Sequence, residues 1–157
     1  MKNLPIRIRN ISAEDLNFVF NSWLKSYRAS AFSRSVTNTI YFDNHHKLIE
    51  KYVLAGNHYI ACDQNDPSQI FGYVVAERVD GILVIHYLYV KQSFRNMGIG
   101  KLLLEQVGFD VKTASIFTHM SEQANRLAAK YNFIYHPYLA FNVSERLEEQ
   151  PKDPKKD

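Results

Sequence analysis

The residues best suited to chemistry lie in a short loop that joins a buried strand to a helix. Ile82–Val90 is a run of nine nearly unbroken apolar residues, typical of a strand buried on both faces. The basic and polar segment Lys91–Asn96 follows, and from Gly98 and Gly100 onward apolar residues recur at helical spacing. A glycine loop in this place aims several backbone N–H groups and a helix N-terminus at one point. The pattern therefore predicts an anion site, above all for phosphate.

Two common phosphate loops do not fit this stretch. Gly100-Lys101 is followed by Leu102, where a nucleoside-triphosphate loop needs Ser or Thr, and its earlier glycine is missing. The dinucleotide pattern G-x-G-x-x-G is also absent, and it would be expected near the first strand. The loop reads Arg95-x-x-Gly98-x-Gly100, preceded by Tyr-Val and followed by Lys-Leu-Leu-Leu. This resembles the pyrophosphate-binding motif of the GNAT family of N-acetyltransferases, which bind acetyl-CoA.

The resemblance implies an α/β (α+β) fold with a mixed sheet of six to seven strands. The family's order is β-α-α-β-β-β-α-β-α-β, and its fourth and fifth strands part at their ends. The pantetheine arm of acetyl-CoA lies in that gap and pairs with the fourth strand's backbone like an added strand. Arg95 either adds a charge-assisted contact to the pyrophosphate or is a solvated loop residue. The cofactor-binding positions implied are Leu88, Tyr89, Val90, Arg95, Asn96, Met97, Gly98, Ile99, Gly100 and Lys101.

The elements before the loop follow from sequence periodicity. Ile6–Asn10 alternates Ile and Arg and predicts a first strand, and Ser12 with Asp15 marks the start of a helix. We expect a polar loop over Ser30–Asp43, because that stretch is rich in Ser, Thr and Asn. A second helix is predicted after it, ending at Gly56 as its C-cap residue.

The rest of the chain predicts the remaining strands. His58–Cys62, Ile70–Val79 and Ile82–Val90 should form an antiparallel meander, in which Asp80-Gly81 makes a hairpin turn. A short fifth strand is expected over Ala114–Thr118, followed by a helix capped by Ser121 and by one or two last strands within Phe133–Val143.

Composition bounds the class of protein. The chain has 157 residues, of which 46% are hydrophobic, as expected for one globular domain over residues 1–143. Nine of the fourteen residues from 144 to 157 are charged, which predicts a flexible tail. A net charge of +3 gives no indication of nucleic acid, and no apolar run predicts a membrane span. The single Cys62 offers neither a disulfide framework nor a metal cluster, which favours a reducing cytoplasm.

Acetyl transfer to an amine requires a base, donors for an oxyanion and an acid for the leaving thiolate. His86 is the first candidate base, because histidine titrates near neutrality and lies here in an apolar strand. Glu77 and His119 are two further candidates, and each of the three could instead be structural. Many family members use a tyrosine on the last helix as the acid, but Ala128 occupies that position here. Tyr131, one turn later, either replaces it or belongs to the core.

The acceptor amine is not specified by the sequence. Trp23–Ser35 and Tyr41–His46 correspond to the family's acceptor side, where Lys25, Arg28 and Arg34 either line a groove or form a solvated face. The chain also resembles, loosely, GNAT proteins encoded by bacteriophages, and a homodimer is compatible with the family. We therefore expect an acetyl-CoA-dependent N-acetyltransferase that acts by direct attack in a ternary complex and needs no metal. The alternative is a GNAT-fold protein that binds CoA or a protein partner without catalysis.

Overall fold

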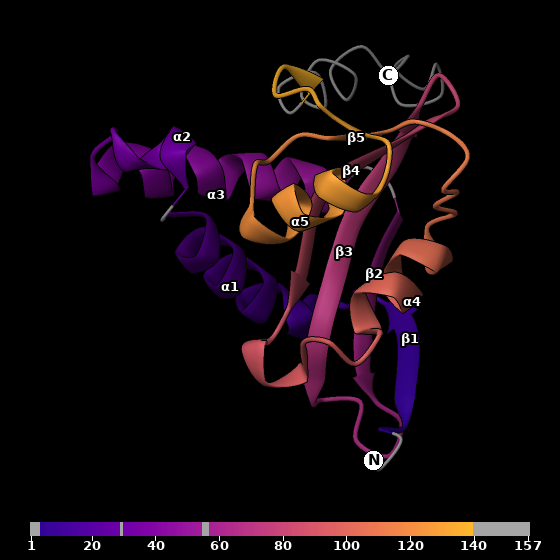
Figure 1. The fold of residues 1–157 in the computed structure, drawn as a ribbon. Coiled ribbons are helices and arrows are strands. Elements are labelled where there is room, and N and C mark those ends of the chain that lie inside the picture. The colour runs from indigo at the N-terminus through magenta and orange to yellow at the C-terminus, as the bar shows by residue number, and fades with distance from the viewer. Residues whose placement is uncertain (1–3, 29, 55–56, 140–157) are drawn as a thin grey trace, which may run out of the picture.

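The computed structural model describes residues 4–28, 30–54 and 57–139, and these form a mixed six-stranded sheet in the order β1-β2-β3-β4-β5-β6 (Figure 1). Strands β1 to β4 pair antiparallel, whereas β4–β5 and β5–β6 are parallel. The strands are β1 Ile6–Asn10, β2 Asn57–Asp63, β3 Ile70–Val79, β4 Ile82–Val90, β5 Ser115–Phe117 and β6 Phe133–Tyr135. The predicted mixed sheet is confirmed, with six strands among the described residues.

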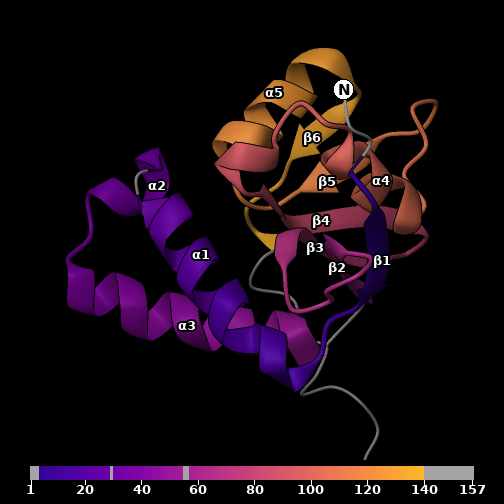
Figure 2. The same ribbon diagram turned by 90° about the horizontal axis from the view of Figure 1, so that it is seen from below.

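Helices cover both faces of this sheet (Figure 2). Helices α1, α2 and α3 lie on one face, and α4 and α5 lie on the other. The helices are α1 Leu16–Arg28, α2 Ala31–Arg34, α3 Asn38–Leu54, α4 Ile99–Gln106 and α5 Glu122–Lys130. Two 3-10 turns, Ala13–Asp15 and Gln92–Phe94, precede α1 and α4.

The two faces of the sheet build separate cores because side chains alternate along each strand. Tyr73 and Val75 of β3 join the core under α1 and α3, together with Trp23. Val74 of β3 points the other way, into a core completed by Leu103 of α4. This explains why β3 and β4 read as unbroken apolar runs: both of their faces are buried.

The predicted polar loop over Ser30–Asp43 is wrong, because two helices begin inside it. Ser30 caps α2, its hydroxyl accepting a hydrogen bond from the N–H of Ser33 at 3.4 Å. The Thr37 hydroxyl accepts from the N–H of Ile40 at 3.3 Å, just before α3 starts. The Ser and Thr residues that suggested a loop are therefore helix caps. The predicted C-cap Gly56 and the tail after residue 139 lie outside the described residues.

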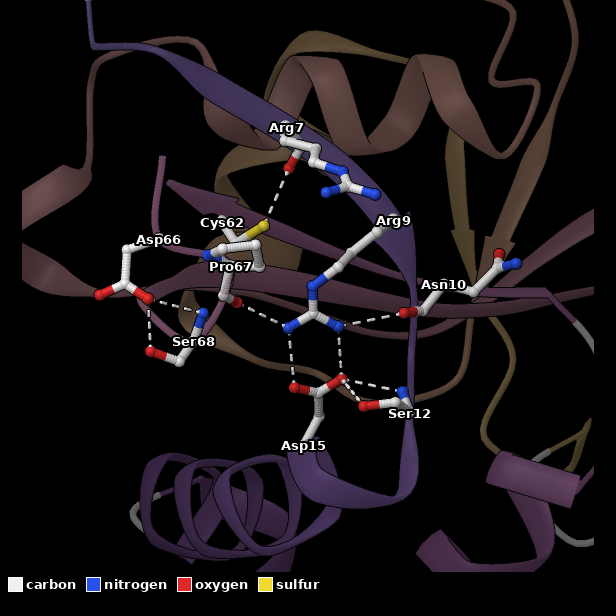
Figure 3. A network of polar contacts seen from close by, with 9 residues as sticks. All are labelled: Arg7, Arg9, Asn10, Ser12, Asp15, Cys62, Asp66, Pro67 and Ser68. Atoms are coloured by element: carbon white, nitrogen blue, oxygen red, sulfur yellow. Dashed lines mark hydrogen bonds and ion pairs between the residues drawn. The ribbon is translucent and has the colours of Figure 1, made fainter. Parts of the chain in front are cut away.

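A polar network ties β1 to the start of α1 (Figure 3). Arg9 forms two parallel hydrogen bonds with the Asp15 carboxylate, at 2.6 and 2.9 Å, and a third with the carbonyl of Pro67. Asp15 also accepts from the backbone N–H of Ser12 at 2.8 Å, as its first-turn position predicted. Burial alone would raise the pKa of Asp15, but the bonds from Arg9 and Ser12 outweigh it and lower that pKa.

Strands β4 and β5 stay together only at one end. Their ladder contains the pairs Val84–Ile116 and Ile85–Phe117, and the N–H of Thr118 then donates to the carbonyl of Ile85 at 3.2 Å. Beyond this point β4 continues to Val90 without a β5 partner among the described residues. The predicted parting of these strands is thus present.

A β-bulge lies at the point where the strands part. Val75 pairs with Tyr87 and Ala76 with Ile85, so His86 is the extra residue on β4. His86 and Tyr87 consequently both face the helices α1 and α3, where His86 stacks on Tyr52. The bulge turns the imidazole of His86 toward the parting strands.

Candidate functional site

The N-terminus of α4 opens onto a cavity of about 280 Å³, which we call the loop cavity. Gly98 caps the helix with φ of +82°, a backbone conformation that favours glycine. The first helical hydrogen bond runs from the N–H of Leu102 to the carbonyl of Gly98, at 3.1 Å. The N–H groups of residues 98 to 101 precede that bond and have no partner within the helix. They are free to bind an anion.

Most of the predicted cofactor-binding residues line the loop cavity. Tyr89 and Met97 do not: the Tyr89 ring stacks on Tyr73 on the opposite face of the sheet, and Met97 is exposed. Their backbones still belong to the strand and loop that border the cavity. The predicted residues that line it are Leu88, Val90, Arg95, Asn96, Gly98, Ile99, Gly100 and Lys101.

The wall of the loop cavity carries more positive than negative charge. Arg95, Lys101 and Arg126 line it, against the single carboxylate of Glu105. Arg95 also donates from Nε to the carbonyl of Val90 at 3.0 Å, which fixes its guanidinium at the cavity rim. Such a balance suits a doubly or triply charged phosphate ligand.

The open edge of β4 is covered by one side chain of α5. In the amide orientation that satisfies both of its groups, Gln123 donates to the carbonyl of Leu88 at 2.6 Å. It also accepts from the N–H of Val90 at 3.3 Å. Gln123 thus makes the pair of hydrogen bonds that an added strand would make there.

A narrow space lies between the parted strands, next to the loop cavity. We call it the strand gap, and its volume is only about 10 Å³. Leu88 and Leu127 border both the strand gap and the loop cavity. His119 borders both the strand gap and a third cavity. The three spaces therefore adjoin one another where β4 and β5 part.

The third cavity, here the helix cavity, has a volume of about 470 Å³ and lies against α3. Aromatic rings make up much of its wall, from Tyr27, Tyr41 and Tyr135. Lys47 and Lys51 also line it, and no Asp or Glu does among the described residues. Lys25, Arg28 and Arg34, which the sequence offered for an acceptor groove, are not part of its wall.

The three candidate bases, Glu77, His86 and His119, come together in the interior. His86 Nε2 lies 3.3 Å from Glu77 Oε2, without the alignment of a full hydrogen bond. His86 Nδ1 and His119 Nδ1 each lie 2.9 Å from the hydroxyl of Thr118. Burial lowers the pKa of His86 to about 3 and that of His119 well below its usual value. His86 is 1% exposed and lines the strand gap but not the helix cavity, so it can reach a ligand in the helix cavity only through neighbours.

The candidate acid Tyr131 lines the loop cavity, next to Phe109 at a ring distance of 5.4 Å. It does not line the strand gap. Two of the described residues that line the strand gap bear a hydroxyl, Tyr87 and Ser121. The Tyr87 hydroxyl lies 2.5 Å from that of Ser26, and Ser121 caps α5 by accepting from the N–H of Ala124 at 3.1 Å. The role of Tyr131 stays a prediction.

Sequence reasoning missed His45, Thr118 and Gln123. His45 was included only in the acceptor-side segment Tyr41–His46, without a role of its own. It lies on a helical face with Tyr41, Ile49 and Tyr52, whose spacing could have revealed its burial. Thr118 and Gln123 carry no local signal, because their partners come from distant parts of the chain.

The described residues lack two kinds of feature, a membrane-spanning helix and a cluster of metal ligands. No helix among the described residues has the length and apolar character to cross a membrane. The same residues contain no group of three or more His, Cys, Asp or Glu side chains arranged to hold a metal ion.

Comparison with known proteins gives a family and a fold. The sequence model of the acetyltransferase (GNAT) domain matches residues 55–135. A candidate acetyltransferase from Pyrococcus furiosus is 20% identical over 94% of this chain and 93% of its own, with a TM-score of 0.51, which shows the fold alone. No curated protein sequence matches significantly.

Two further solved structures are similar over a smaller part. A GNAT acetyltransferase from Staphylococcus aureus Mu50 is 20% identical, with 65% of this chain and 62% of that one covered and a TM-score of 0.45. The Escherichia coli acetyltransferase YhbS, solved in complex with CoA, is 19% identical, with 66% and 54% covered and a TM-score of 0.47. The chain thus spans less than two thirds of the length of both proteins.

Proposed function

Because the chain belongs to the GNAT acetyltransferase family, we propose that it is an acetyl-CoA-dependent N-acetyltransferase that acts by direct attack in a ternary complex. The observation that carries this proposal is that three spaces adjoin one another at the parted strands and share wall residues. An open helix N-terminus lies at one end and a separate cavity at the other. Two ligands could therefore approach from opposite sides and meet at the strand gap.

The residues of the loop cavity fit CoA. The N–H groups of residues 98 to 101 would hold the pyrophosphate, with Arg95 and Lys101 as charge partners. Leu88 and Val90 would hold the pantetheine amides on the β4 edge, which requires that Gln123 release its two hydrogen bonds. The ligand itself supplies an acetyl thioester, and an N–H of β4 near the bulge would stabilise the oxyanion.

The helix cavity is the proposed acceptor site. Its aromatic wall favours an amine with a flat or apolar body. Lys47 and Lys51 in that wall, with no described carboxylate, disfavour acceptors that carry several positive charges. We therefore expect polyamines and lysine-rich peptides to be poorer substrates than neutral or acidic aromatic amines.

One feature favours the alternative, a GNAT-fold protein that binds CoA or a protein without catalysis. Ala128 stands at the position of the family's usual tyrosine, and Tyr131 lies away from the strand gap. Thiolate is a good leaving group, so the missing phenol slows transfer without forbidding it. The cytoplasmic location, the bacteriophage likeness and the single domain over residues 1–143 stay predictions; the buried, unpaired Cys62 fits a reducing compartment.

Titration calorimetry with acetyl-CoA tests the loop cavity, with desulfo-CoA and ATP as comparison ligands. We expect selective, micromolar binding of the two CoA compounds. Gly100→Asp should weaken that binding about 100-fold or more, because it places a carboxylate beside the pyrophosphate. Gly100→Ala is the matched control, since a methyl there would make only ordinary contacts of 3.9 Å with Leu88 and Val90.

The binding measurement, combined with a screen of amines, distinguishes the acetyltransferase from the non-catalytic alternative. Normal binding by Gly100→Asp or by Gly98→Asp would show that CoA does not bind at this loop. Binding by the wild type without thiol release in a screen of amines would favour the non-catalytic alternative. Absence of binding would refute both readings that involve CoA.

A further inference from the structure

A chain of polar side chains lies in the interior, on the side of the sheet that α1 and α3 cover. His86 Nδ1 and His119 Nδ1 each lie 2.9 Å from Thr118 Oγ1, and His119 Nε2 lies 3.0 Å from His45 Nε2. At the far end Glu77 Oε2 lies 3.3 Å from His86 Nε2, a close contact without the alignment of a full hydrogen bond. We call Glu77, His86, Thr118, His119 and His45 the polar chain. All five are buried, and they come from β3, β4, the segment after β5, and α3.

One end of the polar chain meets a ligand site and the other does not. His45, Thr118 and His119 line the helix cavity, the proposed acceptor site, and His86 and His119 line the strand gap. Among the described residues, the His45 ring bonds His119 through Nε2, which leaves Nδ1 as the nitrogen for a ligand. Glu77 lines none of the loop cavity, the strand gap or the helix cavity. The polar chain thus links a cavity to a carboxylate that the ligand cannot touch.

Aromatic rings separate the polar chain from water. Tyr52 stacks on His86 at 4.0 Å, Trp23 meets His119 edge-on at 5.3 Å, and Tyr41 stacks on His45 at 5.3 Å. Burial lowers the pKa of His45 to about 4, in line with the lowered values of His86 and His119. The three imidazoles are therefore neutral at pH 7, each with one N–H and one lone pair.

Neutral imidazoles and one hydroxyl can order their protons along the polar chain in only two ways. If Glu77 is ionised, His86 carries its proton on Nε2 and accepts at Nδ1 from Thr118. Thr118 then accepts from His119 Nδ1–H, and His119 Nε2 accepts from His45 Nε2–H. This order leaves a lone pair on His45 Nδ1, at the cavity. Protonation of Glu77 reverses every link.

We propose that the polar chain is a proton relay that carries the proton of the acceptor amine from His45 to Glu77. The inference rests on the proposed function, because it requires an amine in the helix cavity. As the N–C bond to the acetyl group forms and the C–S bond breaks, the amine proton passes to His45 Nδ1. At each following contact of the polar chain one proton moves to the next group, from His45 through His119, Thr118 and His86. Glu77 is protonated at the end. His45 is then the catalytic base, and His86 is a positioning and relay residue.

The first test needs no acceptor. We would label the histidine rings with ¹⁵N and determine their tautomers by long-range ¹H–¹⁵N NMR at pH 7. The relay predicts Nε2–H at His45, Nδ1–H at His119 and Nε2–H at His86. Thr118→Val should break the chain and give His45 a mixture of tautomers. A wild-type His45 with its proton on Nδ1 would refute the relay, because the chain would then run in the wrong direction.

The second test measures turnover with acetyl-CoA and phenethylamine, an aromatic amine chosen to match the cavity wall. Thr118→Val and Glu77→Gln should each lower kcat about 100-fold, with KM for acetyl-CoA unchanged. Thr118→Ser should keep most of the activity, since it retains the hydroxyl. A packing role for Thr118 predicts the opposite order, because Val keeps the shape and Ser does not.

A surface pair provides the matched control. His46 Nδ1 and Glu50 Oε1 also lie 3.3 Å apart, but both are exposed and belong to no chain. His46→Gln and Glu50→Gln should leave kcat unchanged. Equal kcat for Thr118→Val and Thr118→Ser would overturn the relay. Failure of the wild type to acetylate phenethylamine would count against the proposed acceptor class, and the NMR test would still decide the relay.

Discussion

The buried histidines make the folded state sensitive to mild acid. In the folded protein the pKa values of His86 and His45 are about 3 and about 4, against 6.5 for an unperturbed histidine. Below pH 6.5 the unfolded chain therefore binds protons that the folded protein does not. By linkage, the free energy of unfolding is at its full value above pH 6.5 and is lost as the pH falls toward 4.

The size of this loss follows from the two pKa values. Between pH 7 and pH 5 an unfolded histidine becomes mostly protonated, whereas His86 and His45 stay neutral in the fold. Each ring then lowers the free energy of unfolding by about 2 kcal/mol, so the pair lowers it by about 4 kcal/mol. His119 acts in the same direction. A domain of this kind is stable by only about 5–15 kcal/mol, so the loss is a large fraction.

Urea unfolding at pH 7 and at pH 5 measures this loss. Fluorescence of Trp23, the single tryptophan, reports on the packing around His119, and far-UV circular dichroism reports on the helices. His86→Gln should reduce the difference between the two pH values by about 2 kcal/mol, the contribution of one buried ring. A free energy of unfolding that changes by less than about 1 kcal/mol would refute the reasoning.

Two further predictions concern the β4 edge and the N-terminal network. Gln123→Ala should tighten acetyl-CoA binding about 3- to 10-fold in calorimetry, because the ligand no longer displaces two hydrogen bonds. The control is Gln106→Ala, at the exposed end of α4, which should leave the affinity unchanged. Arg9→Met should lower the free energy of unfolding by about 3 kcal/mol, since it leaves the Asp15 carboxylate buried without its partner. The exposed Arg7→Met is its control, and equal stability of the two variants would show that the Arg9–Asp15 pair contributes little.

The local features of the fold were predictable, and the long-range ones were not. The bounds of β1, β3 and β4 agree with the sequence because alternation, apolar runs and the Asp80-Gly81 turn are local signals. Both turn residues indeed have positive φ, 51° and 80°. The start of α3 was missed because Ser and Thr serve both loops and caps.

The candidate site shows the same difference between local features, which were predictable, and long-range features, which were not. The glycine loop was visible because its chemistry is contained in a few consecutive residues. The polar chain was not, because it depends on contacts between residues as distant as His45 and His119. Even the candidate bases Glu77, His86 and His119 could be named only one by one. Their common hydrogen-bond partner, Thr118, became evident from the fold alone.

The short β4–β5 ladder also divides the molecule by local stability. Strand β5 is held to β4 by only two residue pairs, and α5 buries none of its residues fully. The segment from β5 to β6 is therefore expected to open at a lower free energy than the antiparallel strands β1 to β4. A ligand that contacts both β4 and α5 across the gap would stabilise this weakly held contact between β4 and the segment from β5 to β6. Cofactor binding and the ordering of the segment from β5 to β6 would then be thermodynamically coupled, each favouring the other.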